Sequence, residues 1–227
     1  MAEVAETAAS PLDCAMVYRM LAGTQWRQGK FGLAASHLRR AIHLSEQDDS
    51  SAGLLSLARS LHALAITLRK QGGGVEAEEH HRRALELYRE LSEPIGEAAT
   101  LNGLGTLHYD RGEYEDALRD CSEALCVVEK TPDRSGLADV LYTLGKIRHS
   151  RSELDQALGL YQHAGEIYRA LDHWANEDKV LCLYADVLVA TGRSREAVEA
   201  LERVLVLRER MGGSGVREAR DRLEGLR

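Results

Sequence analysis

The chain has 227 residues, of which 44% are hydrophobic and 29% charged, with three prolines and one phenylalanine. This length suits one large domain or a short repeat array with a real core, and a composition dominated by alanine, leucine, glutamate and arginine favours helices. A net charge of −7 argues against nucleic acid as the main partner, and no uninterrupted run of 18 apolar residues predicts a membrane-spanning helix.

The first residues, 1–13, read MAEVAETAASPLD and lack the basic start and apolar stretch of a secretion signal, so we expect a disordered leader. Four cysteines follow, at Cys14, Cys121, Cys126 and Cys182, and no two of them form a C-x-x-C pair. We expect small buried hydrophobes in a reducing compartment and a cytoplasmic protein. A disulfide framework or a metal cluster is the alternative.

One pattern recurs five times, with a spacing of 40 residues, or 43 between its first two copies. It is anchored on a small residue: Ala22, Ala65, Gly105, Gly145 and Ala185. Four residues earlier stands a large apolar residue: Tyr18, Leu61, Leu101, Leu141 and Leu181. Seven residues later comes Gly29, Gly72, Gly112, Ser152 or Gly192. Twelve residues later comes Ala34, Ala77, Ala117, Ala157 or Ala197, and nineteen later comes Ala41, Ala84, Ala124, Ala164 or Val204.

Two glycines of the third copy explain the pattern. Glycine inside a helix costs about 1 kcal/mol relative to alanine. We therefore expect that Gly105 lies where a neighbouring helix approaches too closely for a larger side chain. Gly112 has a different role, because it follows one helix and precedes another, where a left-handed cap residue is favoured.

Each copy is therefore predicted to be a helix–turn–helix unit. The first helices are expected at 14–28, 54–70, 95–110, 134–150 and 174–190. The second helices are expected at 31–46, 75–91, 114–129, 154–170 and 194–210. The resulting repeats cover 14–211, at about 14–48, 54–92, 95–130, 134–171 and 174–211. In the tail, 212–227, Val216, Ala219, Leu223 and Leu226 share a helical stripe, which predicts a capping helix.

The pattern L-x2-L-[GA]-x6-G-x4-A-x6-A resembles the tetratricopeptide repeat. The usual period of that family is 34 residues, and the longer period here resembles repeats of cell-polarity adaptors, kinesin light chains, peptide-sensing bacterial regulators and actinobacterial transcription regulators. The resemblance implies an all-α fold, a right-handed α-solenoid of five repeats whose concave wall is lined by the first helices. His81 and Cys121 occupy a usually bulky position, which weakens packing predictions there.

The resemblance also implies which residues line the concave groove. Carried over by position, the predicted binding residues are Arg19, Trp26, Arg27, Arg59, His62, Arg69, Lys70, Asn102, Thr106, Tyr109, Tyr142, Lys146, His149 and Lys179. The remaining positions of the wall are Met16, Gly23, Ile66, Ala99, Asp110, Asp139, Ser150, Cys182, Asp186, Val189 and Ala190. All positions together, five in each first helix, hold seven arginines and lysines against three aspartates, a charge of +4 in an acidic chain. Such a wall suits an extended acidic peptide or a peptide carboxylate.

Two alternatives to an acidic-ligand groove stay open for this wall. The first is a solvated mixed face, in which Arg27, Arg69 and Lys70 simply complement the dipoles of the helices that they end, and Trp26 packs between the first two repeats. The second is self-association, although we favour a monomer.

No sequence motif supports catalysis, a cofactor or a metal. The chain has no GxxxxGK[ST], GxSxG or HExxH motif. His80 and His81 are adjacent, so on a helix they project about 100° apart and cannot hold one metal as an i, i+4 pair would. The arginines alternate with acids at helical spacing, and we expect no nucleic acid binding.

We therefore expect a non-enzymatic adaptor that binds a protein or an extended, acidic peptide in the groove. The alternative is a ligand-sensing regulatory module of a larger signalling or transcription-regulator system.

Overall fold

The computed structural model describes residues 10–226, and within that range the protein is entirely helical, with eleven helices and no strand. The first helices of the five pairs are α2 (Pro11–Arg27), α4 (Ser51–Lys70), α6 (Pro94–Asp110), α8 (Arg134–Ser150) and α10 (Trp174–Ala190). The second helices are α3 (Phe31–Ser45), α5 (Gly74–Glu90), α7 (Tyr114–Val128), α9 (Leu154–Ala170) and α11 (Ser194–Arg210), and α12 (Val216–Glu224) follows. The chain divides into two compact units, residues 1–112 and 113–227, so the third pair contributes one helix to each.

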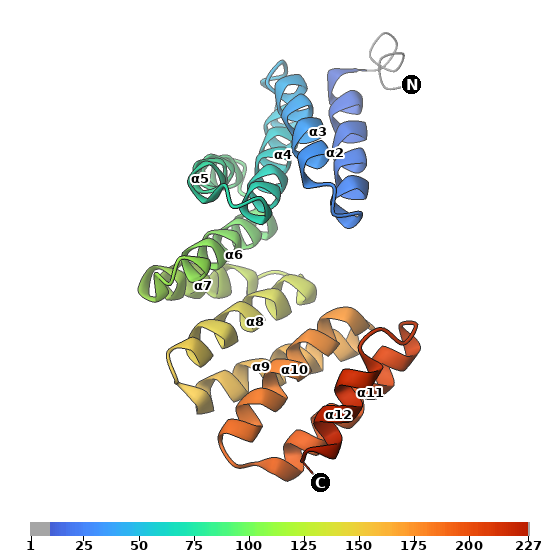
Figure 1. Ribbon diagram of the computed structural model, residues 1–227. Coiled ribbons are helices and arrows are strands. Elements are labelled where there is room, and N and C mark those ends of the chain that lie inside the picture. The colour runs from blue at the N-terminus through green and yellow to red at the C-terminus, as the bar shows by residue number, and fades with distance from the viewer. Residues whose placement is uncertain (1–9, 227) are drawn as a thin grey trace. The chain divides into compact units, whose positions relative to one another are not determined.

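The first unit is built from α2, α3, α4, α5 and α6, and Figure 1 shows α2 and α3 lying side by side. Each helix packs on its sequence neighbour, and α4 also contacts α2 and α6. In the core of this unit, small residues pack against leucines, among them Ala22, Leu38, Leu64 and Leu107. α4 therefore contacts the second helices α3 and α5 and the first helices α2 and α6.

The second unit contains α7 to α12, and α12 packs on α11. Ala219 and Leu223 of α12 are buried against a core that includes Val204 and Leu201 of α11. The apolar stripe of α12 therefore covers the last pair, as expected of a solenoid end that needs a polar outer face.

The recurring alanines explain how closely the paired helices pack. All five residues of the column that begins at Ala34 have no exposed surface, and the same holds for the column from Ala41 to Val204. Gly145, in the small-residue column, lies against the Tyr161 ring of the paired helix. Small side chains allow the helix axes to approach, as the sequence indicated.

The turns inside the pairs have the backbone geometry that the sequence predicts. Gly29, Gly72, Gly112 and Gly192 have φ angles of 73°, 84°, 78° and 75°. Ser152, which replaces glycine in the fourth pair, has a φ angle of 62°. A left-handed residue closes each first helix, and glycine adopts this conformation without steric cost.

The predicted leader 1–13 is too long at its C-terminal end. α2 already begins at Pro11, because Ser10 and Asp13 form a capping box and proline is favoured in the first turn of a helix. Residues 1–9 lie outside the described range. The other helix bounds of the five pairs differ from the predicted ones by at most three residues, and α12 is shorter than the predicted capping segment 212–227.

α4 is the one helix within residues 10–226 that is apolar and long enough to cross a membrane, judged by length and composition alone. It has 20 residues, and its most apolar 18-residue stretch has a mean hydropathy of 1.3. Half of that stretch is buried, and Leu57, Leu61 and Leu64 pack inside the first unit. The core helix of a folded unit accounts for such a composition.

The four cysteines are all free thiols. Cys14 and Cys121 are buried, and burial raises the pKa of Cys121 to about 12. Cys182 is half-buried, but Cys126 is exposed on α7, so the expectation of buried cysteines is wrong for that residue.

Candidate functional site: the face of the first helices

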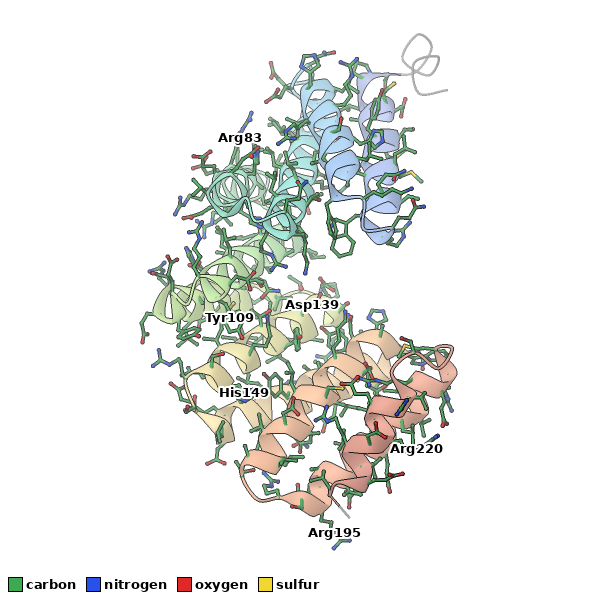
Figure 2. The ribbon with its side chains drawn as sticks, viewed as in Figure 1. Arg83, Tyr109, Asp139, His149, Arg195 and Arg220 are labelled. Carbon is green, nitrogen blue, oxygen red and sulfur yellow. The ribbon has the colours of Figure 1, made fainter. Side chains whose placement is uncertain are left out.

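None of the fourteen predicted groove residues is buried in the structure. In α2, α4, α6 and α8 the three central positions of the predicted stripe are half-buried and the two end positions are exposed. Figure 2 shows two of these residues, Asp139 and His149, on α8, and a third, Tyr109, on α6. The stripe is therefore accessible along each helix, and its local chemistry differs between the two units.

The first unit has an apolar cavity of about 290 Å³ on this face, between α2 and α4. Four predicted wall residues line it together with four that the pattern did not include: Arg19, Gly23, Trp26 and Ile66, and Ala22, Leu38, Ala63 and Thr67. Trp26 also packs on the core and against Phe31, with 5.9 Å between ring centroids. Trp26 thus packs between the first two repeats and also lines the cavity.

Arg19, which lines this cavity, and Arg59, which lies near Arg19, have no acidic partner within residues 10–226. Arg19 is half-buried and donates to Ser56 Oγ at 3.1 Å, and Arg59 is exposed on α4. Burial lowers the pKa of Arg19, and the nearby charge of Arg59 lowers it further. Within residues 10–226, neither guanidinium forms an ion pair. The Tyr88 phenol lies close to both, and burial raises its pKa to about 12.

The other cations of the first unit are placed differently. Arg69 is ion-paired with Asp110 of α6. Lys70 is exposed at the end of α4, and exposed Arg27 donates to Thr24 Oγ1 at 3.4 Å. Ion pairing therefore neutralises one of the five basic residues that the predicted wall contributes to this unit.

Three predicted wall residues of the first unit have local structural roles. The Thr100 hydroxyl donates to the Gly96 carbonyl at 2.8 Å, so it accepts from His62 Nδ1, which lies 3.1 Å away. Burial lowers the pKa of His62 to about 4, so His62 adds no positive charge near neutral pH. The Thr106 hydroxyl donates to the main-chain carbonyl of Asn102 at 2.8 Å.

In the second unit the wall is electrically balanced. Lys146 Nζ lies 5.4 Å from the centroid of the Tyr142 ring, and Lys179 lies near Asp139. Desolvation raises the pKa of Asp139, although Tyr168 donates a hydrogen bond to it. A cavity of about 160 Å³ is lined by Asp139, Tyr142, Tyr168, Asn176, Lys179 and Val180. Asp186 of this wall is ion-paired with Arg222 of α12.

Several site residues were absent from the sequence-based prediction. Ala63 and Thr67 follow His62 and Ile66 directly, so a stripe one residue wider would have included them. Ser56, which holds Arg19, carries no such signal, because its role depends on the contact between α2 and α4. No group of three or more potential metal ligands occurs in the described part of the chain.

Antiparallel helix pairs that recur every forty residues, with an accessible face on the first helices, define a helical repeat protein of the solenoid class. The family model of the tetratricopeptide repeat matches residues 56–125, 96–170 and 136–210. The chain therefore belongs to the tetratricopeptide repeat family.

Known proteins with similar sequences or folds include regulators. The chain is 29% identical over 166 residues to the regulatory protein AfsR of Streptomyces griseus, covering 72% of this chain and 16% of AfsR. BtubC (BKLC) from P. vanneervenii superposes with a TM-score of 0.76 at 20% identity, over 93% of this chain and 86% of BtubC. A Rap protein, solved in complex with Competence and Sporulation Factor, gives a TM-score of 0.79 at 17% identity, over 99% and 68% of the chains. The two structural matches show the shared fold.

Proposed function

We propose that the chain is a non-enzymatic protein-interaction adaptor whose first unit binds an acidic segment of a partner protein. The observation that carries this proposal is the pair Arg19 and Arg59, which adjoins an apolar cavity and has no carboxylate partner within residues 10–226. Cytoplasmic localisation and a monomeric state belong to the same proposal.

The distribution of charge supports an acidic ligand. The wall of the first unit contributes five arginines and lysines and one aspartate, whereas that of the second contributes two lysines and two aspartates. The whole chain carries −7, so a basic face on an acidic protein focuses the field toward an anionic partner. Electrostatic complementarity of this kind raises association rates and fixes the register of a bound chain.

A second candidate is a ligand-sensing regulatory module. Its support is the similarity to AfsR, of which the chain spans only 16%, and the fold shared with a Rap protein solved with Competence and Sporulation Factor. In this reading, binding in the groove changes the curvature of the repeats. A ligand-dependent change in small-angle scattering of the chain would favour this candidate over a passive adaptor.

Charge reversal tests the adaptor proposal. Arg27, Arg59 and Lys70 are exposed and unpaired with carboxylates in the described range, so changing all three to glutamate should leave the fold intact. The matched control changes Arg195, Arg217 and Arg220 to glutamate, since their side chains are 94%, 95% and 57% exposed on α11 and α12. Figure 2 labels Arg195 and Arg220.

Proteins captured by the wild type are quantified by mass spectrometry against both triple variants. We expect acidic partners to be lost with the Arg27, Arg59 and Lys70 variant and kept with the control, and their capture to weaken as salt rises. Equal capture by all three proteins would overturn the proposal. Light scattering over a range of concentrations tests the monomeric state.

A further inference from the structure

We propose that Arg19, Arg59 and the adjoining apolar cavity form one two-part subsite, which takes a peptide carrying a carboxylate side chain next to an apolar side chain. This inference rests on the proposed function, because it specifies the ligand of the same face.

The half of the subsite that binds the carboxylate is formed by guanidinium N–H groups that have no acceptor in the described part of the chain. A guanidinium has five N–H groups. Within residues 10–226, Arg19 uses one of them, toward Ser56 Oγ, and Arg59 uses none. Ser56 of α4 thus holds the guanidinium of Arg19, which belongs to α2. Arg59 is also a residue of α4. The positive charges of Arg59 and half-buried Arg19 repel each other, which costs free energy. A bound carboxylate would offset this repulsion by accepting hydrogen bonds from both guanidinium groups.

The apolar half is the cavity between α2 and α4. Arg19 is the only charged residue among those that line it, and the others include Trp26, Ala63 and Ile66. Its volume of about 290 Å³ lies just below the range for ligand pockets, about 300–1,000 Å³, which suits one side chain better than a whole ligand. The indole N–H of Trp26, which is buried, has no acceptor within residues 10–226.

The two halves are continuous, because Arg19 belongs to both. Its side chain lines the cavity and interacts with Arg59. An anion on the guanidinium pair therefore lies beside the cavity entrance, so the two ligand groups must be neighbours along a peptide. This geometry selects an acidic segment interrupted by an apolar residue over a uniformly acidic one.

Gly23 offers a way to fill the cavity without changing any charge. It lines the cavity, and a Cβ added there meets its nearest atom, Arg27 Nη1, at 3.8 Å, an ordinary contact. Gly23→Leu should fold normally, since leucine is a better helix former than glycine by up to about 1 kcal/mol. The matched control is Gly159→Leu, on the exposed side of α9 with nothing within 4 Å of the added Cβ.

The test measures fluorescence anisotropy of labelled peptides with the full chain. One probe has glutamates flanking a central leucine, a second replaces leucine with serine, a third replaces the glutamates with glutamine, and a fourth replaces them with phosphoserine. We expect the wild type to bind the leucine probe about tenfold more tightly than the serine and glutamine probes. Gly23→Leu should abolish the preference for leucine over serine, and Gly159→Leu should keep it.

The arginines are tested in the same assay. Arg19→Gln and Arg59→Gln should each weaken the leucine probe by about tenfold and reduce its salt dependence, whereas Arg195→Gln should change neither. Equal binding of the leucine and serine probes, or unchanged binding by the Gly23 and arginine variants, would overturn the subsite. Binding of the phosphoserine probe alone would overturn its assignment to carboxylates.

The inference can fail while the proposed function stands. In that case partner capture still depends on the Arg27, Arg59 and Lys70 charges, but Gly23→Leu binds all peptides as the wild type does. If the proposed function fails, the charge-reversed triple variant also captures partners normally.

Discussion

The Tyr161 ring lies against the backbone of Gly145, and a Cβ atom added to that glycine would stand 2.6 Å from Tyr161 Cε1. We predict that Gly145→Leu lowers the free energy of unfolding by about 1–3 kcal/mol, because the buried ring must move. Gly145→Ala should cost less, since alanine regains about 1 kcal/mol of helix propensity. Urea denaturation measures both, and Gly105→Leu, in the same column of α6, should act in the same direction.

The control for this prediction is Gly159→Ala, which has open space around the added Cβ and should stabilise the protein slightly. A Gly145→Leu protein as stable as the wild type would show that the small-residue column does not limit the approach of the helices.

Ser152 has a φ angle of 62°, where the other four repeats have glycine. A left-handed conformation costs most L-residues about 1–2 kcal/mol, so we predict that Ser152→Gly raises the melting temperature. Gly192→Ala, at the equivalent turn of the next pair with a φ angle of 75°, should lower it. A Ser152→Gly variant that melts below the wild type would contradict the role assigned to this position.

Glu177 is completely buried and accepts hydrogen bonds from Arg169 at 2.8 Å and from Arg203 at 2.9 Å. Burial raises the pKa of Glu177, but the two arginines together outweigh burial and the pKa is lowered. We predict that Glu177→Gln destabilises the second unit by about 1–3 kcal/mol, because it removes the carboxylate to which Arg169 and Arg203 donate. Glu199→Gln, in an exposed pair with Arg195, should change stability by less than about 1 kcal/mol in the same denaturation assay.

Half-buried His62 and buried His81 lie in contact in the first unit, with ring centroids 5.2 Å apart. His81 is 1% exposed, neither of its ring nitrogens has a partner within residues 10–226, and its ring lies against Gly103. Burial lowers the pKa of both, to about 4 for His62, and His62, Arg69 and His80 lower that of His81 further. Both rings are therefore neutral in the folded protein at pH 7.

Because the folded-state pKa of this pair lies below the unfolded value near 6.5, the unfolded chain binds protons first as the pH falls. We predict full stability above pH 6.5 and a progressive loss toward pH 4, of about 2–3 kcal/mol from His62 alone. Denaturation of the wild type and of the His62→Leu, His81→Leu double variant at several pH values isolates this contribution. Parallel pH profiles of the two proteins would contradict the prediction.

Much of the fold could be predicted because its signals are local and repeated. Ala34 and Ala41 recur as columns with no exposed surface, and Gly29 marks a left-handed turn found in every pair. The start of α2 was predicted three residues late, because the apolar pattern does not include the capping box of Ser10 and Asp13. Cys126 was expected to be buried, but residue type alone does not show which side of a helix faces solvent.

The positions of the candidate site along the first helices could be predicted, but the ion pairs, hydrogen bonds and protonation of its side chains could not. The resemblance to the tetratricopeptide repeat implied that Arg19, Arg59, Arg69 and His62 lie on one face of the first helices, and each arginine was counted as a charge. Only the structure shows that Asp110, 41 residues away, neutralises Arg69, and that Ser56 holds Arg19. It also shows that His62 is neutral beside Thr100.

The amino-acid sequence by itself determined the helices, their turns and the small residues between them. The reason is that each repeat contacts its neighbours in the same way, so the same residue pattern recurs along the chain. The tertiary structure decided which cations have partners and where a cavity opens. Those properties depend on side chains that meet across helices from different repeats, and no single helix contains both members of such a contact. Arg19 and Arg59, which have no carboxylate partner within residues 10–226, are therefore recognised as neighbours only when α2 and α4 are packed together.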